Sequence, residues 1–301
     1  MNASSRICVL GAETLLGAAL VRALARRGIC DVVRELASGV ECVFVADGRS
    51  GGILANQKYP ADLCLDNLLV ATRVIPEAYR LGVKNLLYLG SSCIYPKHAP
   101  QPMAVESLMS GPLEPTSEPY ALAKLAGLKL CEAWRRQYGV RFMAAIPADV
   151  YGPGGKFDPE DSHVIPSLMA RMHNAKERGF DHLTLWGTGN PRREFIHADD
   201  LADACLHVME KHDGDAPMNL GSGEATSIRE LAETLREVVG FSGELRWDLA
   251  RPDGAPVKWL DTAPLRALSW RPSIGLKEGL FATYRHFLDL KQAAKASTCN
   301  S

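Results

Sequence analysis

The sequence has no excess of charge of either sign, because 34 Lys and Arg residues stand against 35 Asp and Glu residues and give a formal net charge of −1. It contains no basic run or stripe, so nucleic acid is not an expected partner. No apolar stretch reaches about eighteen residues, and the first residues lack the basic region, long apolar run and cleavage site of a secretory signal. We therefore expect a cytoplasmic protein with no membrane partner.

The cysteines are also notable for patterns that they do not form. The eight residues make no C-x-x-C pair and no metal-ligand spacing with histidine, so neither a disulfide framework nor a metal site is expected. We interpret most of them as small core residues in a reducing compartment. They are Cys8, Cys30, Cys42, Cys64, Cys93, Cys131, Cys205 and Cys299.

The composition is that of a chain with a large buried core, since 47% of its 301 residues are hydrophobic and 23% are charged. Short apolar runs alternate with segments of helical periodicity. The predicted strands are 6–11, 41–47, 85–92, 141–152 and 183–187, and the predicted helices are 14–28, 60–81, 118–138 and 162–177. This alternation predicts an α/β fold with a doubly wound parallel sheet of the Rossmann type.

The pattern becomes irregular after residue 150, where the segments 151–163 and 251–264 are rich in proline and glycine. We predict a dinucleotide-binding domain at 1–150, to which 183–215 returns, and a smaller, mainly substrate-binding lobe at 151–301. Ligands of such folds bind at the carboxyl ends of the parallel strands, which is where the lobe is expected.

The stretch "GAETLLG" has the position of a dinucleotide-binding turn, between the first predicted strand and helix. Gly11 and Gly17 match its end glycines, whereas Thr14 stands at its middle glycine. In such turns, backbone N–H groups at a helix N-terminus receive the pyrophosphate. We therefore predict that these three residues bind a dinucleotide cofactor.

The segment after this helix is unusually short. Only twelve residues separate Gly28 from the strand at Glu41, whereas about thirty normally hold a second strand, a crossover and a third strand. The acid or arginine that contacts the cofactor ribose usually follows the second strand. Arg34 and Glu35 are the nearest candidates.

"SEPYALAKLAGLKLCE" places Tyr120 and Lys124 one helical turn apart on the same face of a helix. Ser117 is its expected N-cap, and Gly139 can close its far end. An ammonium beside a phenol stabilises the phenolate, so we expect the lysine to lower the pKa of Tyr120. Taken alone, the pattern also fits a surface lysine beside a half-buried tyrosine.

Several longer segments carry a resemblance to one enzyme family. They are "YLGSSCIYPKHAPQPMAVESL", "SEPYALAKLAGLKLCE", "YGPGGKFDPEDSHVIPSLMARMHNA", "LWGTGNPRREFIHADDLADACLHVME" and "RPDGAPVKWLD". Together they resemble the GDP-L-fucose synthases, the GDP-4-keto-6-deoxy-mannose epimerase/reductases of the extended short-chain dehydrogenases. The likeness covers nearly the whole chain from residue 51 onward. It implies NADPH-dependent 3,5-epimerisation and 4-reduction of the sugar, with NAD as a possible alternative cofactor.

The resemblance also implies residue roles. Ser91, Tyr120 and Lys124 match the hydride-transfer triad, in which the tyrosine protonates the oxygen at C4. Cys93 and His163 match the pair that exchanges protons at C3 and C5, and Tyr120, Lys124 and His163 also border the cofactor. This agrees with basic chemistry, since a 4-keto group acidifies both neighbouring C–H bonds.

For the GDP-deoxyhexose substrate, the resemblance implies contacts from Arg171, Trp186, Arg193 and Lys258. As single residues, the three cations also fit solvated surface charges. The family further suggests a homodimer packed through the Tyr120 helix and its neighbour.

Two residues depart from the family pattern. Glu13 stands where many members carry an arginine near the cofactor, and Asp149 replaces an asparagine. Two alternatives therefore stay open beside the epimerase/reductase: a nucleotide-sugar epimerase with no net redox change, and a non-catalytic sensor of dinucleotides or sugar nucleotides.

Overall fold

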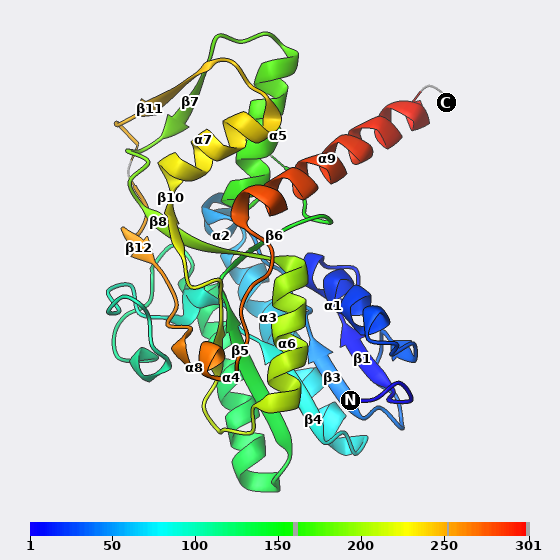
Figure 1. Ribbon diagram of the computed structural model, residues 1–301. Helices are drawn as coiled ribbons and strands as arrows, with labels where there is room; N and C mark the ends of the chain where they lie inside the picture. Colours follow the sequence, from blue (N-terminus) through cyan, green and yellow to red (C-terminus); the bar gives the residue numbers. More distant parts are fainter. Residues whose placement is uncertain (159–161, 252, 299–301) are drawn as a thin grey trace.

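A central parallel sheet organises the protein. The computed structural model describes residues 1–158, 162–251 and 253–298. Six strands lie in the order β2-β1-β3-β4-β5-β9, and every neighbouring pair is parallel. They are β1 (Ile7–Leu10), β2 (Val32–Val33), β3 (Cys42–Val45), β4 (Asn85–Leu89), β5 (Arg141–Pro147) and β9 (Met218–Leu220). The predicted doubly wound fold is confirmed (Figure 1).

Two pairs of helices cover the faces of this sheet. α1 (Leu15–Arg26) packs beside α6 (Ala198–Lys211), and α3 (Pro60–Arg80) packs beside α4 (Glu118–Tyr138). In Figure 1 the first pair lies in front of the sheet and the second behind it. The short α2 (Ile53–Lys58) precedes α3. Because both faces are covered, the strands can be apolar throughout, and β3 is buried at every residue.

The connection between α1 and β3 is as short as the sequence indicated. β2 has two residues, and residues 34–41, all of which are described, run to β3 without a helix. Arg34 and Glu35 are both exposed in this loop.

A second apolar core is built from residues beyond 150, in the upper part of Figure 1. Its strands form two small sheets, one with β6 (Asp149–Tyr151), β8 (Arg192–His197), β10 (Ala225–Ser227) and β12 (Val257–Lys258), the other with β7 (His182–Trp186) and β11 (Glu244–Asp248). Its helices are α5 (Val164–Glu177), α7 (Ile228–Val239) and α9 (Leu276–Thr298), while α8 (Ala263–Ala267) packs near β9. None of the helices within the described ranges is long and apolar enough to cross a membrane.

The segment 141–152 forms two strands rather than the single strand that we predicted. β5 ends at Pro147 in the central sheet, and β6 begins at Asp149 and pairs with β8 in a different sheet. The chain thus leaves one sheet for the other at Ala148.

We predicted that the segment 183–215 returns to the dinucleotide-binding domain. Its residues lie in both cores, since Leu185 of β7 belongs to the second core and Leu201 of α6 belongs to the first. The division of the chain into domains remains a prediction.

The cysteines within the described ranges are free. Four of them, Cys8, Cys42, Cys131 and Cys205, are buried. Cys299 lies outside the described residues.

Candidate active site

The glycine turn is shaped by close backbone contacts. Gly11 has φ +73°, and a Cβ at this position would lie 2.8 Å from the Ala46 carbonyl oxygen. A Cβ at Gly17 would overlap the Gly11 carbonyl group. Thr14 is the N-cap of α1, and its hydroxyl accepts a hydrogen bond from the Gly17 N–H (3.0 Å) while donating to the Gly11 carbonyl (2.8 Å). The turn therefore brings backbone N–H groups to the start of a helix, which suits a pyrophosphate.

Tyr120 and Lys124 lie on one face of α4, and both are buried. Ser117 occupies the N-cap position as expected, although its side chain makes no capping bond, and Gly139 closes the helix at φ 67°. The Lys124 ammonium donates to the Leu89 carbonyl (3.1 Å) at the end of β4. Burial lowers the pKa of Lys124 to about 8, and Asp47 opposes this shift.

The expected direction of the Tyr120 pKa is wrong in this structure. Burial raises the pKa, nearby Cys93 adds to the increase, and a hydrogen bond with Ser91 lowers it only in part. The physical reason is that a buried phenolate loses its hydration, while the Lys124 ammonium is engaged by the Leu89 carbonyl. Burial therefore holds the Tyr120 phenol in its neutral, protonated form.

Ser91 and Cys93 come to this tyrosine because β4 ends in a tight turn. The 3₁₀ helix Ser92–Ile94 begins immediately after Ser91, whose hydroxyl accepts a hydrogen bond from the Cys93 N–H (3.2 Å). The Ser91 hydroxyl also interacts with the Tyr120 phenol, whose pKa it acts to lower. Three of the predicted catalytic residues are therefore grouped at the carboxyl end of β4.

Lys258 joins this group from the far end of the chain. Its ammonium lies 3.3 Å from the Cys93 sulfur and 3.9 Å from an Asp149 carboxylate oxygen. The pairing of β12 with β8 places Lys258 opposite Arg193. Burial works to lower the pKa of Lys258, but Cys93 and Asp149 outweigh it, so the net shift is upward.

His163 stands at the N-cap position of α5 and is exposed. Although the side chain is exposed, the protein atoms packed around the imidazole desolvate it in part and lower its pKa; Asp149 acts to raise the pKa, and Lys258 acts to lower it further. The imidazole is thus within electrostatic reach of the same two charges that flank Cys93. His163 is therefore linked to the other predicted catalytic residues through these charges, and not through a direct contact.

The other predicted substrate residues are less closely grouped. Arg193 donates to the Ala255 carbonyl (2.7 Å), and burial lowers its pKa against the influence of Asp149 and Cys93. Arg171 donates to the Thr184 carbonyl on β7 (2.6 Å). Trp186, also on β7, is 54% exposed, with the Arg251 guanidinium 4.9 Å from its ring centroid. Arg193 thus lies within electrostatic reach of Cys93, one of the predicted catalytic residues, whereas the contacts of Arg171 and Trp186 lie along β7.

Sequence reasoning missed Glu194, which is buried in β8. Its carboxylate accepts hydrogen bonds from the backbone N–H groups of Gly223 (2.7 Å) and Leu260 (2.8 Å). Burial raises its pKa to about 7, although these hydrogen bonds oppose the shift. An available signal was the charged residue inside the strand "RREFIH", where inward positions should be apolar.

Asp47 was missed as well. It follows β3 and acts on the Lys124 pKa, and the next residue, Gly48, faces the ammonium so closely that a Cβ would lie 3.4 Å from Nζ. Its place at the carboxyl end of a parallel strand was the available signal.

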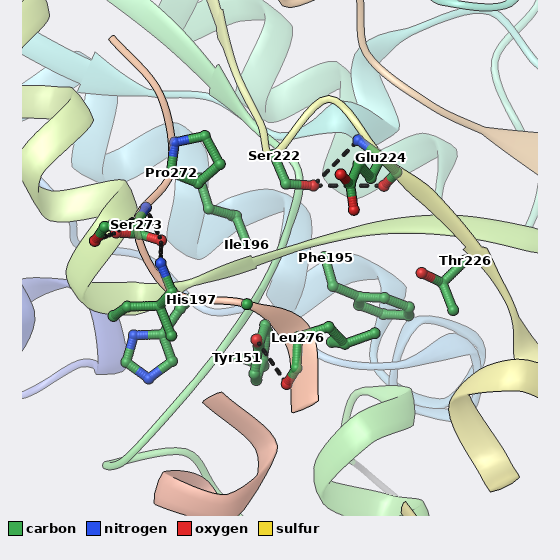
Figure 2. A pocket seen from close by; sticks show the side chains of 13 residues that line it. Tyr151, Phe195, Ile196, His197, Ser222, Glu224, Thr226, Pro272, Ser273 and Leu276 are labelled. Atoms are coloured by element: carbon green, nitrogen blue, oxygen red, sulfur yellow. Dashed lines mark hydrogen bonds between the residues drawn. The ribbon is translucent and has the colours of Figure 1, made fainter. Parts of the chain in front are cut away.

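A separate cavity of about 200 Å³ lies between β8 and the segment before α9. Figure 2 shows Ser273 beside His197 on one wall, and Ser222 bonded to Glu224 on another. Ser273 binds the Asp200 carboxylate. The residues lining this cavity include none of the five predicted catalytic side chains.

Several known proteins are similar to this chain in sequence and in fold. The model of the NAD dependent epimerase/dehydratase family matches residues 31–221. GDP-L-fucose synthase 1 of Arabidopsis thaliana is 45% identical over 95% of this chain and 94% of its own. GDP-L-fucose synthase of Escherichia coli K12 is 41% identical over 94% and 97%.

A solved structure extends the comparison to three dimensions. A GDP-mannoheptose C4 reductase from Campylobacter jejuni with NADP bound is 30% identical and superposes with a TM-score of 0.85, covering 95% of this chain and 99% of its own. On these grounds the chain belongs to the NAD dependent epimerase/dehydratase family, within its GDP-L-fucose synthase branch.

Proposed function

We propose that this chain is an NADPH-dependent epimerase/reductase, which converts GDP-4-keto-6-deoxy-D-mannose to GDP-L-fucose or a closely related GDP-deoxysugar. The observation that carries the proposal is the grouping of Ser91, Cys93 and Tyr120 at the end of β4, with Lys258 against the cysteine and His163 in reach of the same charges. The names of the relatives support the same substrate.

The cofactor proposal rests on the glycine turn and the buried lysine. Gly11, Thr14 and Gly17 would hold the pyrophosphate at the start of α1, and the Lys124 ammonium would bind ribose hydroxyls. NADP is bound in the related reductase structure. Bound NADPH would supply the hydride that reduces C4.

In the reduction, Tyr120 gives its proton to the C4 oxygen as the ketone becomes a hydroxyl. Ser91 would hold that oxygen beside the phenol, since its hydroxyl already interacts with Tyr120. Lys124, one helical turn away on α4, would hold the cofactor ribose beside this tyrosine. A proton from solvent then restores the neutral tyrosine.

In the epimerisation, Cys93 and His163 exchange the protons of C3 and C5. The 4-keto group makes both carbons acidic, so one group removes a proton from one face and the other returns a proton to the opposite face. Arg171, Trp186, Arg193 and Lys258 would bind the GDP part, three of them as cations that suit a diphosphate.

We also infer a homodimer formed through α3 and α4. Leu65 and Leu69 lie one turn apart on α3 and are 56% and 54% exposed, and Leu122 on the adjacent α4 is 50% exposed. Two copies of this helix pair could bury these leucines in a four-helix contact.

We further infer that the protein resides in a reducing compartment such as the cytoplasm. The cysteines in the described ranges are free, and four of them are buried, which supports this inference.

The decisive experiment incubates the purified protein with GDP-4-keto-6-deoxy-mannose and either NADPH or NADH. We expect the reduced cofactor to be consumed and an epimerised, reduced GDP-sugar to form. Epimerisation without net consumption of the cofactor would favour the nucleotide-sugar epimerase. Binding of the dinucleotide or sugar nucleotide without turnover would favour the sensor.

A further inference from the structure

Lys258 and Cys93 make a contact that the proposed mechanism does not use. The Lys258 ammonium donates a hydrogen bond to the Cys93 sulfur at 3.3 Å. The pKa of Lys258 is shifted upward overall, against the effect of burial, so the side chain carries a full positive charge at neutral pH. It is 21% exposed, and water therefore screens the contact with the sulfur only in part.

The residues that follow the lysine are bound to the loop that follows the cysteine. The Trp259 N–H donates to the Gln101 side-chain oxygen (2.9 Å), and the Trp259 carbonyl accepts from the Met103 N–H (2.7 Å). The Asp261 N–H donates to the Met103 carbonyl (2.9 Å). The two segments that carry the lysine and the cysteine are thus joined by their backbones as well as by the side-chain contact.

Further hydrogen bonds hold each partner from its other side. The Leu260 N–H donates to the buried Glu194 carboxylate (2.8 Å), and β12, the short strand that carries the lysine, pairs with β8. The Cys93 N–H donates to the Ser91 hydroxyl (3.2 Å) at the end of β4. The contact therefore belongs to a fixed scaffold, unlike the transient contacts of a flexible surface lysine.

A cation at hydrogen-bond distance stabilises a thiolate relative to a thiol, and the thiolate is the form of cysteine that accepts protons and attacks electrophiles. The other groups near the sulfur offer less. Arg193 is within electrostatic reach but donates to the Ala255 carbonyl (2.7 Å), and Tyr120 is held neutral by burial. Asp149 opposes a second negative charge, but its carboxylate lies 3.9 Å from the Lys258 ammonium, which compensates it.

We propose that Lys258 is a positioning residue for Cys93, whose ammonium keeps the sulfur in the reactive thiolate form at neutral pH. This role acts through the cysteine and exists in the protein without substrate, so it is distinct from a contact with the GDP part. The thiolate is a property of the chain itself. Its use in the exchange of sugar protons rests on the proposed function.

The first test alkylates the wild-type protein with iodoacetamide at pH 7, and peptide mass spectrometry follows each cysteine separately. The reagent is neutral, so the lysine does not attract it, and only a thiolate displaces its iodide rapidly. We expect the half-buried Cys93 to react faster than Cys30, although Cys30 is exposed. A Cys30 that reacts as fast as Cys93, or faster, overturns the proposal.

The second test compares Lys258→Met with Lys258→Arg. We expect Lys258→Met to slow the alkylation of Cys93 by at least about threefold, the effect of losing one partly exposed charge contact. Lys258→Arg keeps the charge and should react faster than Lys258→Met. Lys97→Met is the matched control, since the Lys97 ammonium lies 3.3 Å from the Glu114 carboxylate, and it should keep the wild-type rate. An unchanged or faster reaction of Cys93 in Lys258→Met overturns the proposal.

Deuterium incorporation from D₂O at C3 and C5 of the sugar connects this pair to epimerisation. At a saturating concentration of the GDP-sugar, where weaker binding has no effect, Lys258→Met should incorporate deuterium more slowly and Lys258→Arg should recover part of the rate. Unchanged incorporation in Lys258→Met removes the pair from the epimerisation. If no form of the protein turns over the sugar but the alkylation rates change as expected, the proposed function fails and the role of Lys258 at Cys93 stands.

Discussion

At the residue scale, the burial of a side chain affects its protonation state more than the residues near it in sequence do. Tyr120 and Lys124 are one turn apart, yet burial keeps the phenol protonated and lowers the pKa of the lysine to about 8. The Tyr120 phenol therefore keeps its proton at neutral pH. A proton donor for the C4 oxygen needs this state.

Tyr120→Phe should reduce turnover by at least a hundredfold, because it removes the proton donor but keeps the ring and its packing. The measurement is the rate of NADPH consumption with GDP-4-keto-6-deoxy-mannose. Tyr88→Phe is the matched control, since the Tyr88 hydroxyl is buried without a hydrogen-bond partner. It should leave turnover intact and raise the free energy of unfolding by about 1–3 kcal/mol, the desolvation penalty of an unpaired polar group. Wild-type turnover in Tyr120→Phe would remove the tyrosine from the mechanism.

Glu194 should make stability depend on pH. Its pKa rises from 4.5 to about 7 on folding, so between these values the folded chain holds a proton that the unfolded chain has lost. The free energy of unfolding should therefore fall as the pH rises from 4.5 to 7, by on the order of 3 kcal/mol from this residue. Urea unfolding across this range should show a flatter profile for Glu194→Gln, while the exposed-site control Glu224→Gln keeps the wild-type slope. Parallel profiles for all three proteins would contradict the assignment.

At the scale of elements, the close approach of α4 to β4 positions the residues of the site. Gly127 of α4 lies so near β4 that a Cβ would overlap the Tyr88 ring. Gly127→Ala should thus lower the free energy of unfolding by about 1–3 kcal/mol, although alanine favours a helix. Gly275, where a Cβ meets nothing within 4 Å, is the control, and Gly275→Ala should be near neutral. Denaturant unfolding checks both, and equal stabilities would contradict this packing.

The turn before α1 should control the choice between the two dinucleotides. Glu13 is exposed there and would repel a 2′-phosphate, and the shortened loop after β2 leaves Arg34 as a nearby exposed cation. We expect the wild type to prefer NADPH by no more than about tenfold. Glu13→Arg should increase this preference, as measured by kcat/KM for each cofactor. A wild-type preference of a hundredfold or more would show that another cation binds the phosphate.

At the scale of the whole molecule, the exposed leucines of α3 and α4 should determine the assembly. Leu122→Lys places a charge in the proposed four-helix contact, so light scattering should show a monomer where the wild type shows a dimer. Leu290→Lys changes an exposed leucine on α9 and should leave the dimer intact. A Leu122→Lys dimer would move the interface elsewhere.

Much of this protein could be predicted from the sequence, because the signals are local. Apolar runs and helical periods determine the central sheet and its helices. The close backbone contacts at Gly11 and Gly17 require glycine, so the spacing of the glycines in the sequence predicts the turn. The spacing of Tyr120 and Lys124 places them on one helix face, whatever the rest of the chain does.

Only the tertiary structure decided what depends on contacts between distant segments. Lys258 meets Cys93 because β12 pairs with β8, and 165 positions separate the two residues in sequence. Asp149 reaches the same cluster because the chain changes sheets after Pro147, a break that an apolar run does not reveal. The direction of the Tyr120 pKa followed from burial, which the helix pattern alone does not specify. Local periodicity determines which face a side chain occupies, whereas desolvation and charge pairing arise only when the sheets assemble.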